Sequence, residues 1–287
     1  MAAPLKDYLK SLPFYFLPHH LISWMSYHLG RIAWEPVKRR FIRSYLSLHA
    51  LDMSEALLTD PYAYKSLNAL FTRALKPECR PFADGENTLL CPIDGTVSQA
   101  GVIEDGRIFQ AKGRDYSLLE LVGGNKALAE PFMGGRFATL YLSPVDYHRV
   151  HMPLAARLSD MLYVPGRLFS VAPATVRAIP RLFARNERLV CRFDTAAGPM
   201  ALVMVGAINV SAIDTVWAGA VTPPSARRVH HTRYRPGITI ELDKGAEMGR
   251  FNLGSTVIVL MGANTRWDAA ITPEAKVRLG QALGHYD

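Results

Sequence analysis

The sequence predicts an α+β protein in which amphipathic helices near the N-terminus precede a mainly antiparallel β core. Two observations support this: apolar residues repeat at intervals of three and four in the N-terminal part, and short β-like runs with turn residues between them follow from about residue 88. Of the 287 residues, 49% are hydrophobic and 20% are charged, which excludes a wholly disordered or collagen-like chain. This length fits one large domain or two small ones.

The first elements expected are helices that span residues 19–34, 36–49 and 61–76. Pro36 suits the first turn of the second helix, and Pro77 ends the third. Two interpretations of the first two helices stay open. Either they pack on a core of their own, or they form an anchor with aromatic residues at the acyl boundary and basic residues on anionic headgroups. We assign residues 1–76 to a helical, membrane-associating region.

The elements that follow are mostly short strands, with a hairpin turn at 104–106 and a capping box at 117–120 that predicts a short helix. The expected strands cover residues 88–91, 95–102, 107–112, 136–143, 155–164, 188–194, 200–213, 237–242 and 255–261. We expect a final helix over residues 273–283. Residues 77–287 are therefore assigned to a single β-rich domain.

The net charge of +8 favours anionic partners, which are nucleic acid, anionic lipid or an acidic substrate. Residues 1–50 hold seven Lys or Arg, two Asp or Glu and nine aromatic residues, a composition typical of an interfacial segment. No nucleic-acid recognition motif is visible, so we expect a lipid partner and no nucleic acid. The three cysteines have wide spacings and no CxxC pair, which predicts no disulfide framework.

No membrane span is predicted, because no run of about 20 apolar residues occurs. The first apolar run is broken by Pro13 and Pro18 and no signal-peptide cleavage site follows it. We therefore expect a protein in the cytoplasm, or one bound to the membrane from the cytoplasmic side.

Three places carry residues suited to chemistry. Asp94 precedes a glycine between two strand-like runs, His148 and His151 lie three residues apart, and Ser255 follows Gly254 before a β-branched run. Each has a plain structural interpretation as a turn or a loop histidine. The two histidines could be metal ligands, but no second cluster at ligand spacing lies nearby, so we predict no metal. Together the residues permit a Ser/His/Asp constellation with Asp94 orienting, His151 as base and Ser255 as nucleophile.

Four stretches closely resemble the bacterial phosphatidylserine decarboxylases: YLSPVDYHRVHMP (141–153), LFARNERLVCRFD (182–194), TVWAG (215–219) and KGAEMGRFNLGST (244–256). The LGST processing sequence of that family is intact at residues 253–256. The likeness runs from the N-terminal helices to about residue 262. From residues 264–287 we infer nothing functional.

The resemblance implies that His151, held by Asp94, deprotonates Ser255, whose hydroxyl attacks the carbonyl of Gly254. The chain would then be cleaved into a β subunit, 1–254, and an α subunit, 255–287, with Ser255 converted into a covalent pyruvoyl group. This electrophile would form a Schiff base with phosphatidylserine and yield phosphatidylethanolamine and CO₂. His148 would serve as proton donor or shuttle.

The resemblance also implies weaker roles for Tyr141, Ser143 and Tyr147, which would shape the substrate pocket. An enzyme with a two-chain lipid substrate should lie on the membrane surface, and we expect it on the cytoplasmic face, with a homodimer suggested by the likeness. Two other functions remain open. A serine hydrolase would use Asp94, His151 and Ser255 directly in an uncut chain, and a lipid-binding module would need no catalytic serine.

Overall fold

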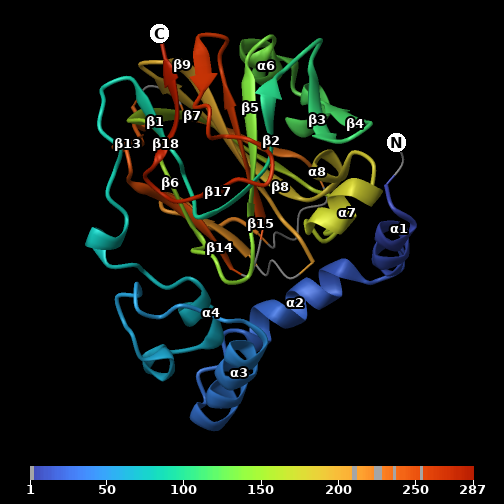
Figure 1. The fold of residues 1–287 in the computed structure, drawn as a ribbon, viewed down its shortest axis with the longest axis vertical. Coiled ribbons are helices and arrows are strands. Elements are labelled where there is room, and N and C mark those ends of the chain that lie inside the picture. Colours follow the sequence, from blue (N-terminus) through green and yellow to red (C-terminus); the bar gives the residue numbers. More distant parts are fainter. Residues whose placement is uncertain (1–2, 209–211, 223–227, 235–236, 253–254) are drawn as a thin grey trace.

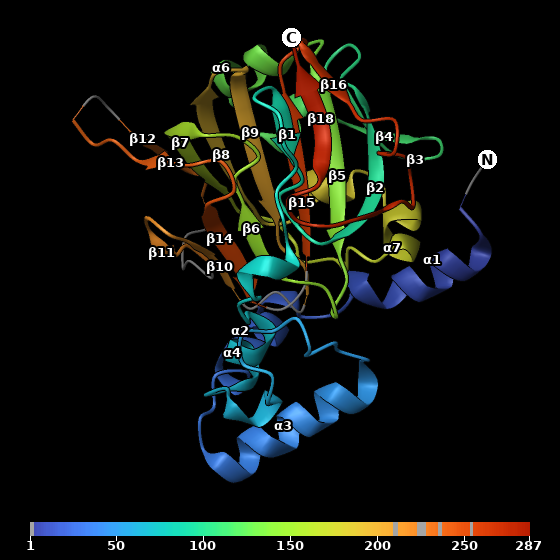
Figure 2. The same ribbon diagram turned by 60° about the vertical axis from the view of Figure 1, so that its left-hand side comes forward.

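The computed structural model describes residues 3–208, 212–222, 228–234, 237–252 and 255–287. Its helices and mostly antiparallel strands confirm the α+β class, with the two longest helices in the N-terminal part (Figure 1). The helical part lies below one end of the β body, and the turned view in Figure 2 shows α3 (Glu35–Leu48) extending away from that body.

The N-terminal helices follow the predicted apolar spacing in part. The second predicted helix is confirmed as α3, while the first, α2 (His19–Leu29), ends early at Gly30. The other elements of this region are α1 (Leu5–Ser11), η1 (Leu12–Tyr15), η2 (Pro61–Ala63), α4 (Leu67–Phe71) and η3 (Pro77–Cys79).

The single helix predicted for residues 61–76 is wrong. The Asp60 side chain caps only the short turn η2, and Ser66 then caps the separate helix α4. After α4 the chain is extended, and Leu75 forms a β-bridge with Ala56. Side-chain caps at two points and this tertiary pairing outweigh the helical spacing of the segment.

The main sheet is antiparallel throughout, in the order β12-β7-β8-β9-β15-β5-β2-β17, with β13 also paired to β7. Its strands are β2 (Gly95–Val102), β5 (Arg136–Leu142), β7 (Ala156–Val164), β8 (Arg188–Thr195), β9 (Gly198–Val205), β12 (His230–Arg233), β13 (Glu241–Leu242), β15 (Ser255–Met261) and β17 (Lys276–Val277). β15 lies between β5 and β9, and its residues from Val257 to Met261 are fully buried.

Three smaller sheets and several short helices complete the body. The sheets are β11 (Gly219–Ala220), β10 (Ala212–Thr215), β14 (Glu247–Asn252) and β6 (Arg149–His151); β1 (Thr88–Leu90), β18 (Ala282–Tyr286) and β16 (Thr265–Trp267); and the hairpin of β3 (Arg107–Ala111) and β4 (Arg114–Ser117). The helices are α5 (Leu118–Leu121), α6 (Lys126–Ala129), η4 (Glu130–Phe132), α7 (Pro173–Ala178) and α8 (Leu182–Arg185).

Three predictions in the β body are wrong in whole or in part. The strand predicted for residues 237–242 is limited to β13, which covers Glu241–Leu242. The strand predicted for residues 200–213 divides into β9 and β10, and part of the segment between them, residues 209–211, lies outside the described residues. The helix predicted for 273–283 is replaced by β17 and β18, because these segments pair with β2 and with β1 and β16. Sheet pairing with distant strands outweighs the local preference.

The two parts of the molecule have very different cores. A continuous apolar core fills the β body, whereas the helical region has a small cluster built on Ile42, Tyr64 and Leu70. Large apolar side chains remain exposed along the helices, among them Leu5, Leu9, Leu12, Phe16, Leu21, Trp24, Trp34 and Leu48. In the part of the chain that the structure describes, no helix is long and apolar enough to cross a bilayer.

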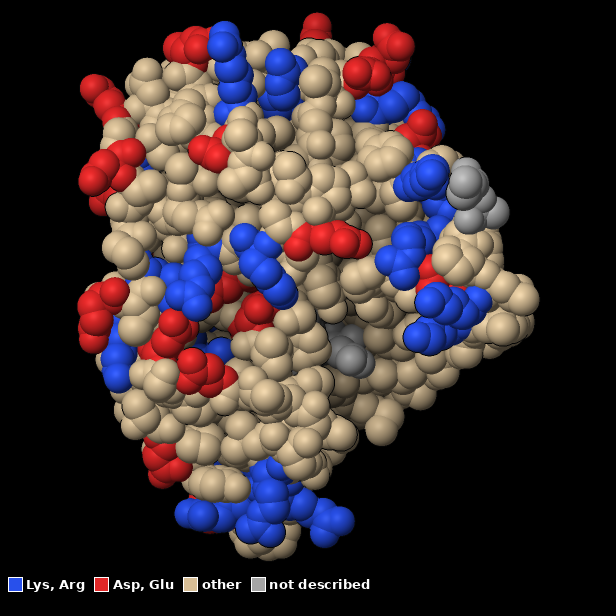
Figure 3. All heavy atoms as spheres, viewed as in Figure 1, with Lys and Arg blue, Asp and Glu red and all other residues tan. Residues whose placement is uncertain are grey.

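Basic side chains gather at the far end of the helical region. Figure 3 shows Lys and Arg clustered over α3, the helix that carries Lys38, Arg39, Arg40 and Arg43. Apolar and basic side chains therefore occupy the same end of the molecule.

Candidate active site

The predicted cleavage point lies at the beginning of the central strand. Ser255 is the first residue of β15, and its main chain is opposite Leu142 of β5. Gly254 lies outside the described residues, and of Ser255 the structure describes the main chain. The strand before this point, β14, pairs with β6, the strand that ends at His151.

His151 is fixed by one hydrogen bond at each ring nitrogen. Nδ1 lies 2.8 Å from the carbonyl oxygen of Gly245, and Nε2 lies 3.1 Å from the hydroxyl of Tyr147. Burial lowers the pKa of His151 from its usual value, although the Gly245 carbonyl favours the protonated ring. Because a carbonyl can only accept, Nδ1 carries the hydrogen, and in the neutral ring Nε2 holds the lone pair. Nε2 is therefore the nitrogen able to act as a base.

The hydroxyl of Tyr147, a residue predicted to shape the substrate pocket, lies against His151. The side chain is buried, and burial raises the pKa of Tyr147 to about 12, so the phenol is neutral at pH 7. It donates its hydrogen to the lone pair on Nε2, and this hydrogen bond must open before Nε2 can take a proton from another group.

Asp94 is bound to Arg80 in the structure. Arg80 Nε lies 2.9 Å from Asp94 Oδ1 and its Nη2 lies 2.5 Å from Oδ2, while the amide of Leu279 donates to Oδ1 at 2.8 Å. The direct hydrogen bond between Asp94 and His151 that the predicted constellation implies is absent from the described residues. Instead the Gly245 carbonyl orients the imidazole, and the charge of Asp94 acts on it from further away by favouring the protonated form.

The support around Asp94 comes from three distant parts of the chain. Glu55 of the helical region accepts from Arg80 Nη2 at 2.7 Å, and Arg278 lies 3.6 Å from the same glutamate. The carboxylates of Asp94 and Glu55 raise the pKa of Arg80 above its usual value. The contact with Leu279 shows that residues 264–287, which the sequence left without a role, contribute directly to the site.

His148 is fully buried and neutral. Its Nδ1 donates to the Asp146 carbonyl at 2.8 Å, and its ring centre lies 4.0 Å from that of Phe71. Its Nε2 has no hydrogen-bond partner within the part of the chain that the structure describes. Burial lowers the pKa of His148 to about 3, with a smaller contribution from the charge of Arg73. A buried lone pair without a donor costs free energy unless another group reaches it.

The other two residues predicted to bind substrate lie in different surroundings. Ser143 donates to Asp146 at 2.7 Å and so closes the turn that leads to His148. Tyr141 lines a cavity of about 390 Å³ between β2, β3 and α7. Burial raises the pKa of Tyr141, so this side chain also remains neutral.

The helical region packs directly on this site, which the sequence did not predict. Three contacts reach the loop before His148 or the strand that carries His151: the Tyr45 hydroxyl donates to the Pro144 carbonyl, Arg73 donates to Val145 at 3.1 Å, and Arg149 donates to Thr72 at 3.0 Å. Asn68 also donates to Asn252 at 2.8 Å, close to the end of β14. The helices therefore contact the end of β14, just before the predicted cleavage point, and the loop between β5 and β6.

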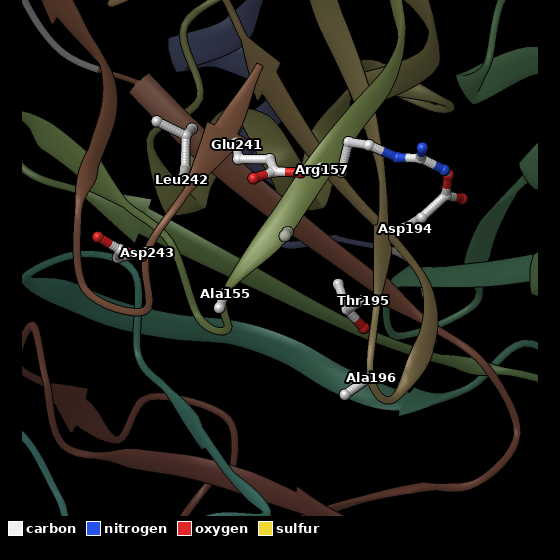
Figure 4. Close-up of a pocket in the computed structure, with 9 residues that line it drawn as sticks. Ala155, Arg157, Asp194, Thr195, Ala196, Glu241, Leu242 and Asp243 are labelled. Atoms are coloured by element: carbon white, nitrogen blue, oxygen red, sulfur yellow. The ribbon is translucent and has the colours of Figure 1, made fainter. Parts of the chain in front are cut away.

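A cavity of about 430 Å³ lies elsewhere, between the ends of β7, β8 and β13 (Figure 4). Figure 4 shows Arg157 extended toward Asp194, and their side chains form an exposed ion pair at 3.2 Å. None of the predicted site residues lines this cavity.

Comparison with known proteins identifies the family. The sequence profile of the family described as phosphatidylserine decarboxylase matches residues 67–285, and a second profile, described as PSD, matches residues 9–47. The match beyond residue 262 corrects the shorter extent inferred from the motifs alone.

Several curated relatives are named phosphatidylserine decarboxylase proenzyme. The relative from Bordetella pertussis is 54% identical over 283 residues, covering 98% of this chain and 95% of its own. Those from Ectopseudomonas mendocina and Pseudomonas fluorescens are 54% and 55% identical over 286 and 275 residues, covering 98% and 94% of this chain and 99% and 94% of their own. The chain therefore belongs to the phosphatidylserine decarboxylase family, a family of decarboxylating enzymes.

Proposed function

We propose that this protein decarboxylates phosphatidylserine to phosphatidylethanolamine and CO₂, after cutting its own chain between Gly254 and Ser255. Relatives that span nearly the whole chain are named proenzymes of this activity. The structural observation that carries the proposal is His151, a neutral imidazole with its basic Nε2 defined by the Gly245 carbonyl, on a strand paired with the one that leads to Ser255.

In the proposed maturation, His151 removes the proton from the Ser255 hydroxyl, and the oxygen attacks the Gly254 carbonyl carbon. The peptide C–N bond breaks, so an ester replaces the amide and the Ser255 nitrogen becomes an amine. Loss of the Cα proton then breaks the ester C–O bond, which releases the Gly254 carboxylate and leaves dehydroalanine at position 255. Addition of water and loss of ammonia give a ketone. The charge of Asp94 supports the first step because it favours the protonated His151 that forms.

The residues around Ser255 fit a pyruvoyl group at this position. Among the described residues, the buried hydroxyl of Thr256, the next residue, has no hydrogen-bond partner, and neither has the buried Nε2 of His148. Such orphaned polar atoms are uncommon in a folded interior and are available to a polar group or substrate beside them. The ketone supplies the electron sink that loss of CO₂ from an amino acid requires.

His148 is proposed as a proton shuttle. Its ring is neutral at pH 7, because burial lowers its pKa to about 3. Nε2 must therefore accept a proton before it can deliver one to the substrate Cα, which suits a shuttle better than a permanently charged acid. Tyr141 is proposed to line the way to the site, because it lines the cavity between β2, β3 and α7 and its main chain pairs with Thr256 of β15.

The helical region is proposed to hold the enzyme on the membrane surface, on its cytoplasmic face. Its exposed apolar side chains and the basic residues of α3 suit the acyl boundary and the anionic headgroups. The same helices contact the loop before His148, which brings the surface of the bilayer close to the site. The homodimer implied by the family resemblance remains a prediction, which sedimentation of the purified enzyme would test.

The test is release of CO₂ from carboxyl-labelled phosphatidylserine in vesicles. Wild-type protein should release CO₂, while Ser255→Ala and His151→Gln should not, and the exposed control His230→Gln should match wild type. Labelling of Ser255 by a fluorophosphonate in an uncut chain that releases no CO₂ would instead support a serine hydrolase. Vesicle binding without either reaction would support a lipid-binding module.

A further inference from the structure

The Phe82 ring lies between two glycine turns that support the proposed site. Both glycines have a left-handed backbone, with φ of +81° at Gly245 and +85° at Gly280. A Cβ added at Gly245 would lie 2.1 Å from Phe82 Cε2, and one added at Gly280 would lie 2.7 Å from Cδ1. The two edges of one ring therefore pack against the bare backbone of two turns that are far apart in the sequence.

Each turn presents a main-chain group to one member of the predicted constellation. The Gly245 carbonyl accepts from His151 Nδ1 at 2.8 Å, and the amide of Leu279, next to Gly280, donates to Asp94 at 2.8 Å. The position of the ring is itself restrained, since the amide of Ala83 donates to the Gly280 carbonyl at 2.7 Å. Both turns also form main-chain hydrogen bonds, from Gly245 to Met152 and from Gly280 to Cys91, so movement of Phe82 would remove its packing from both turns without releasing them from the fold.

The chemistry depends on these two main-chain groups in different ways. The carbonyl determines which nitrogen of His151 carries the hydrogen, so that Nε2 is left as the base. The amide and Arg80 together hold the Asp94 carboxylate in place. The Phe82 side chain is 47% exposed, so it gains less from burial than a core residue does. Its ring nevertheless closely contacts both glycine turns.

We infer that Phe82 is a positioning residue for the self-cleavage of this chain. It acts through the Gly245 carbonyl on His151 and through the Leu279 amide on Asp94. The inference rests on the proposed function for its effect on rate, but the arrangement of His151 can be measured without any reaction. Misplacement of a catalytic group by about 1 Å can cost on the order of 100-fold in rate.

The test compares Phe82→Ala and Phe82→Leu with Phe109→Ala, a control on β3 with a similarly exposed ring. We expect Phe82→Ala to slow cleavage of the full-length precursor roughly 10- to 100-fold. Phe82→Leu should recover most of the rate, because leucine still fills the space between the glycines, and Phe109→Ala should cleave like wild type. Thermal unfolding of each variant in a Ser255→Ala background would show whether the chain folds.

A second readout is the nitrogen-15 spectrum of labelled histidine in the uncleavable Ser255→Ala precursor, with the His151 signals assigned by His151→Gln. In the Ser255→Ala precursor we expect His151 to show a protonated Nδ1 and an unprotonated Nε2. When Phe82→Ala is added, we expect a mixture of the two neutral tautomers of His151. An unchanged His151 spectrum in a folded Phe82→Ala variant, or equal slowing by Phe109→Ala, would overturn the inference. If wild type does not cleave but Phe82→Ala still alters the spectrum, the proposed function fails and the positioning role stands.

Discussion

The β body and the helical region differ in how their apolar residues are used. In the body, the apolar side chains of β15 and its neighbours are buried in one continuous core. In the helical region, a small cluster around Ile42 is accompanied by many exposed apolar side chains, and hydrogen bonds from Tyr45, Asn68 and Arg73 attach the region to the body. The body is therefore stabilised by its own core, whereas the helices leave much of their apolar surface exposed.

The largest expected effect is on the free energy of unfolding, and it distinguishes the core of the body from the cluster of the helical region. Leu260→Ala should lower the free energy of unfolding of the body by about 2–5 kcal/mol, because it leaves a cavity at a fully buried position in β15. Ile42→Ala removes an equally buried side chain, but we expect less than about 1 kcal/mol on unfolding of the sheet, since the helical region can open locally. Urea unfolding with amide hydrogen exchange would measure both, and equal effects on the sheet would contradict the comparison.

Exposed apolar residues in the two parts should differ in their effect on membrane binding. Phe16→Ser should weaken binding to phosphatidylserine vesicles roughly 10- to 30-fold, as expected for loss of about 1.5–2 kcal/mol of side-chain burial in lipid. Ile238→Ser, at an exposed position on the body, should bind like wild type. Co-sedimentation with vesicles would measure this, and a similar loss for both variants would show that the helices are not the binding surface.

His148 should make stability depend on pH. An unfolded histidine has a pKa near 6.5, and burial lowers that of His148 to about 3, so the unfolded state binds the proton more readily. Stability is therefore full above pH 6.5 and falls as the pH drops toward 3, by about 2 kcal/mol at pH 5 from this residue.

The matched variants for this effect are His148→Gln and the exposed His230→Gln. The first should flatten the fall in unfolding free energy between about pH 7 and pH 5, and the second should not. His19 and His151 also have pKa values lowered by burial, so part of the fall will remain. Unfolding curves with identical pH dependence in His148→Gln and wild type would show that His148 is not buried in solution.

The smallest expected effect concerns the ion pair that joins the two regions. Glu55→Gln removes the charge opposite Arg80 and Arg278, but Arg80 keeps its bonds to Asp94. We expect a loss of about 1 kcal/mol or less, seen as faster amide exchange in the helical region with little change in the body. A loss as large as that of Leu260→Ala would mean that the helices are integral to the core.

Local sequence patterns correctly predicted an element where the positions that their apolar spacing marks are also the positions that make the stabilising contacts. The spacing that includes Val37, Phe41 and Tyr45 correctly predicted α3, and the apolar run after Ser255 correctly predicted β15. The predictions for 61–76 and 273–283 failed because caps and pairing with distant strands determine those segments. Such pairings leave no periodic signal in a single sequence.

The site was predictable in its residue types but not in its connections. The motifs singled out Asp94, His148 and His151, yet nothing local to them indicates Arg80 or the Gly245 carbonyl. The amide of Leu279 is 185 positions from Asp94, and no spacing rule covers such a distance. Main-chain groups carry no residue signature, so only the fold reveals them.

The most direct test of the account is the intact mass of purified wild-type protein beside Ser255→Ala. We predict that the wild-type chain separates into residues 1–254 and 255–287, the smaller piece beginning with a pyruvoyl group instead of serine. The Ser255→Ala chain should stay whole. A folded wild-type protein that remains a single uncut chain in the presence of phosphatidylserine vesicles would contradict the account.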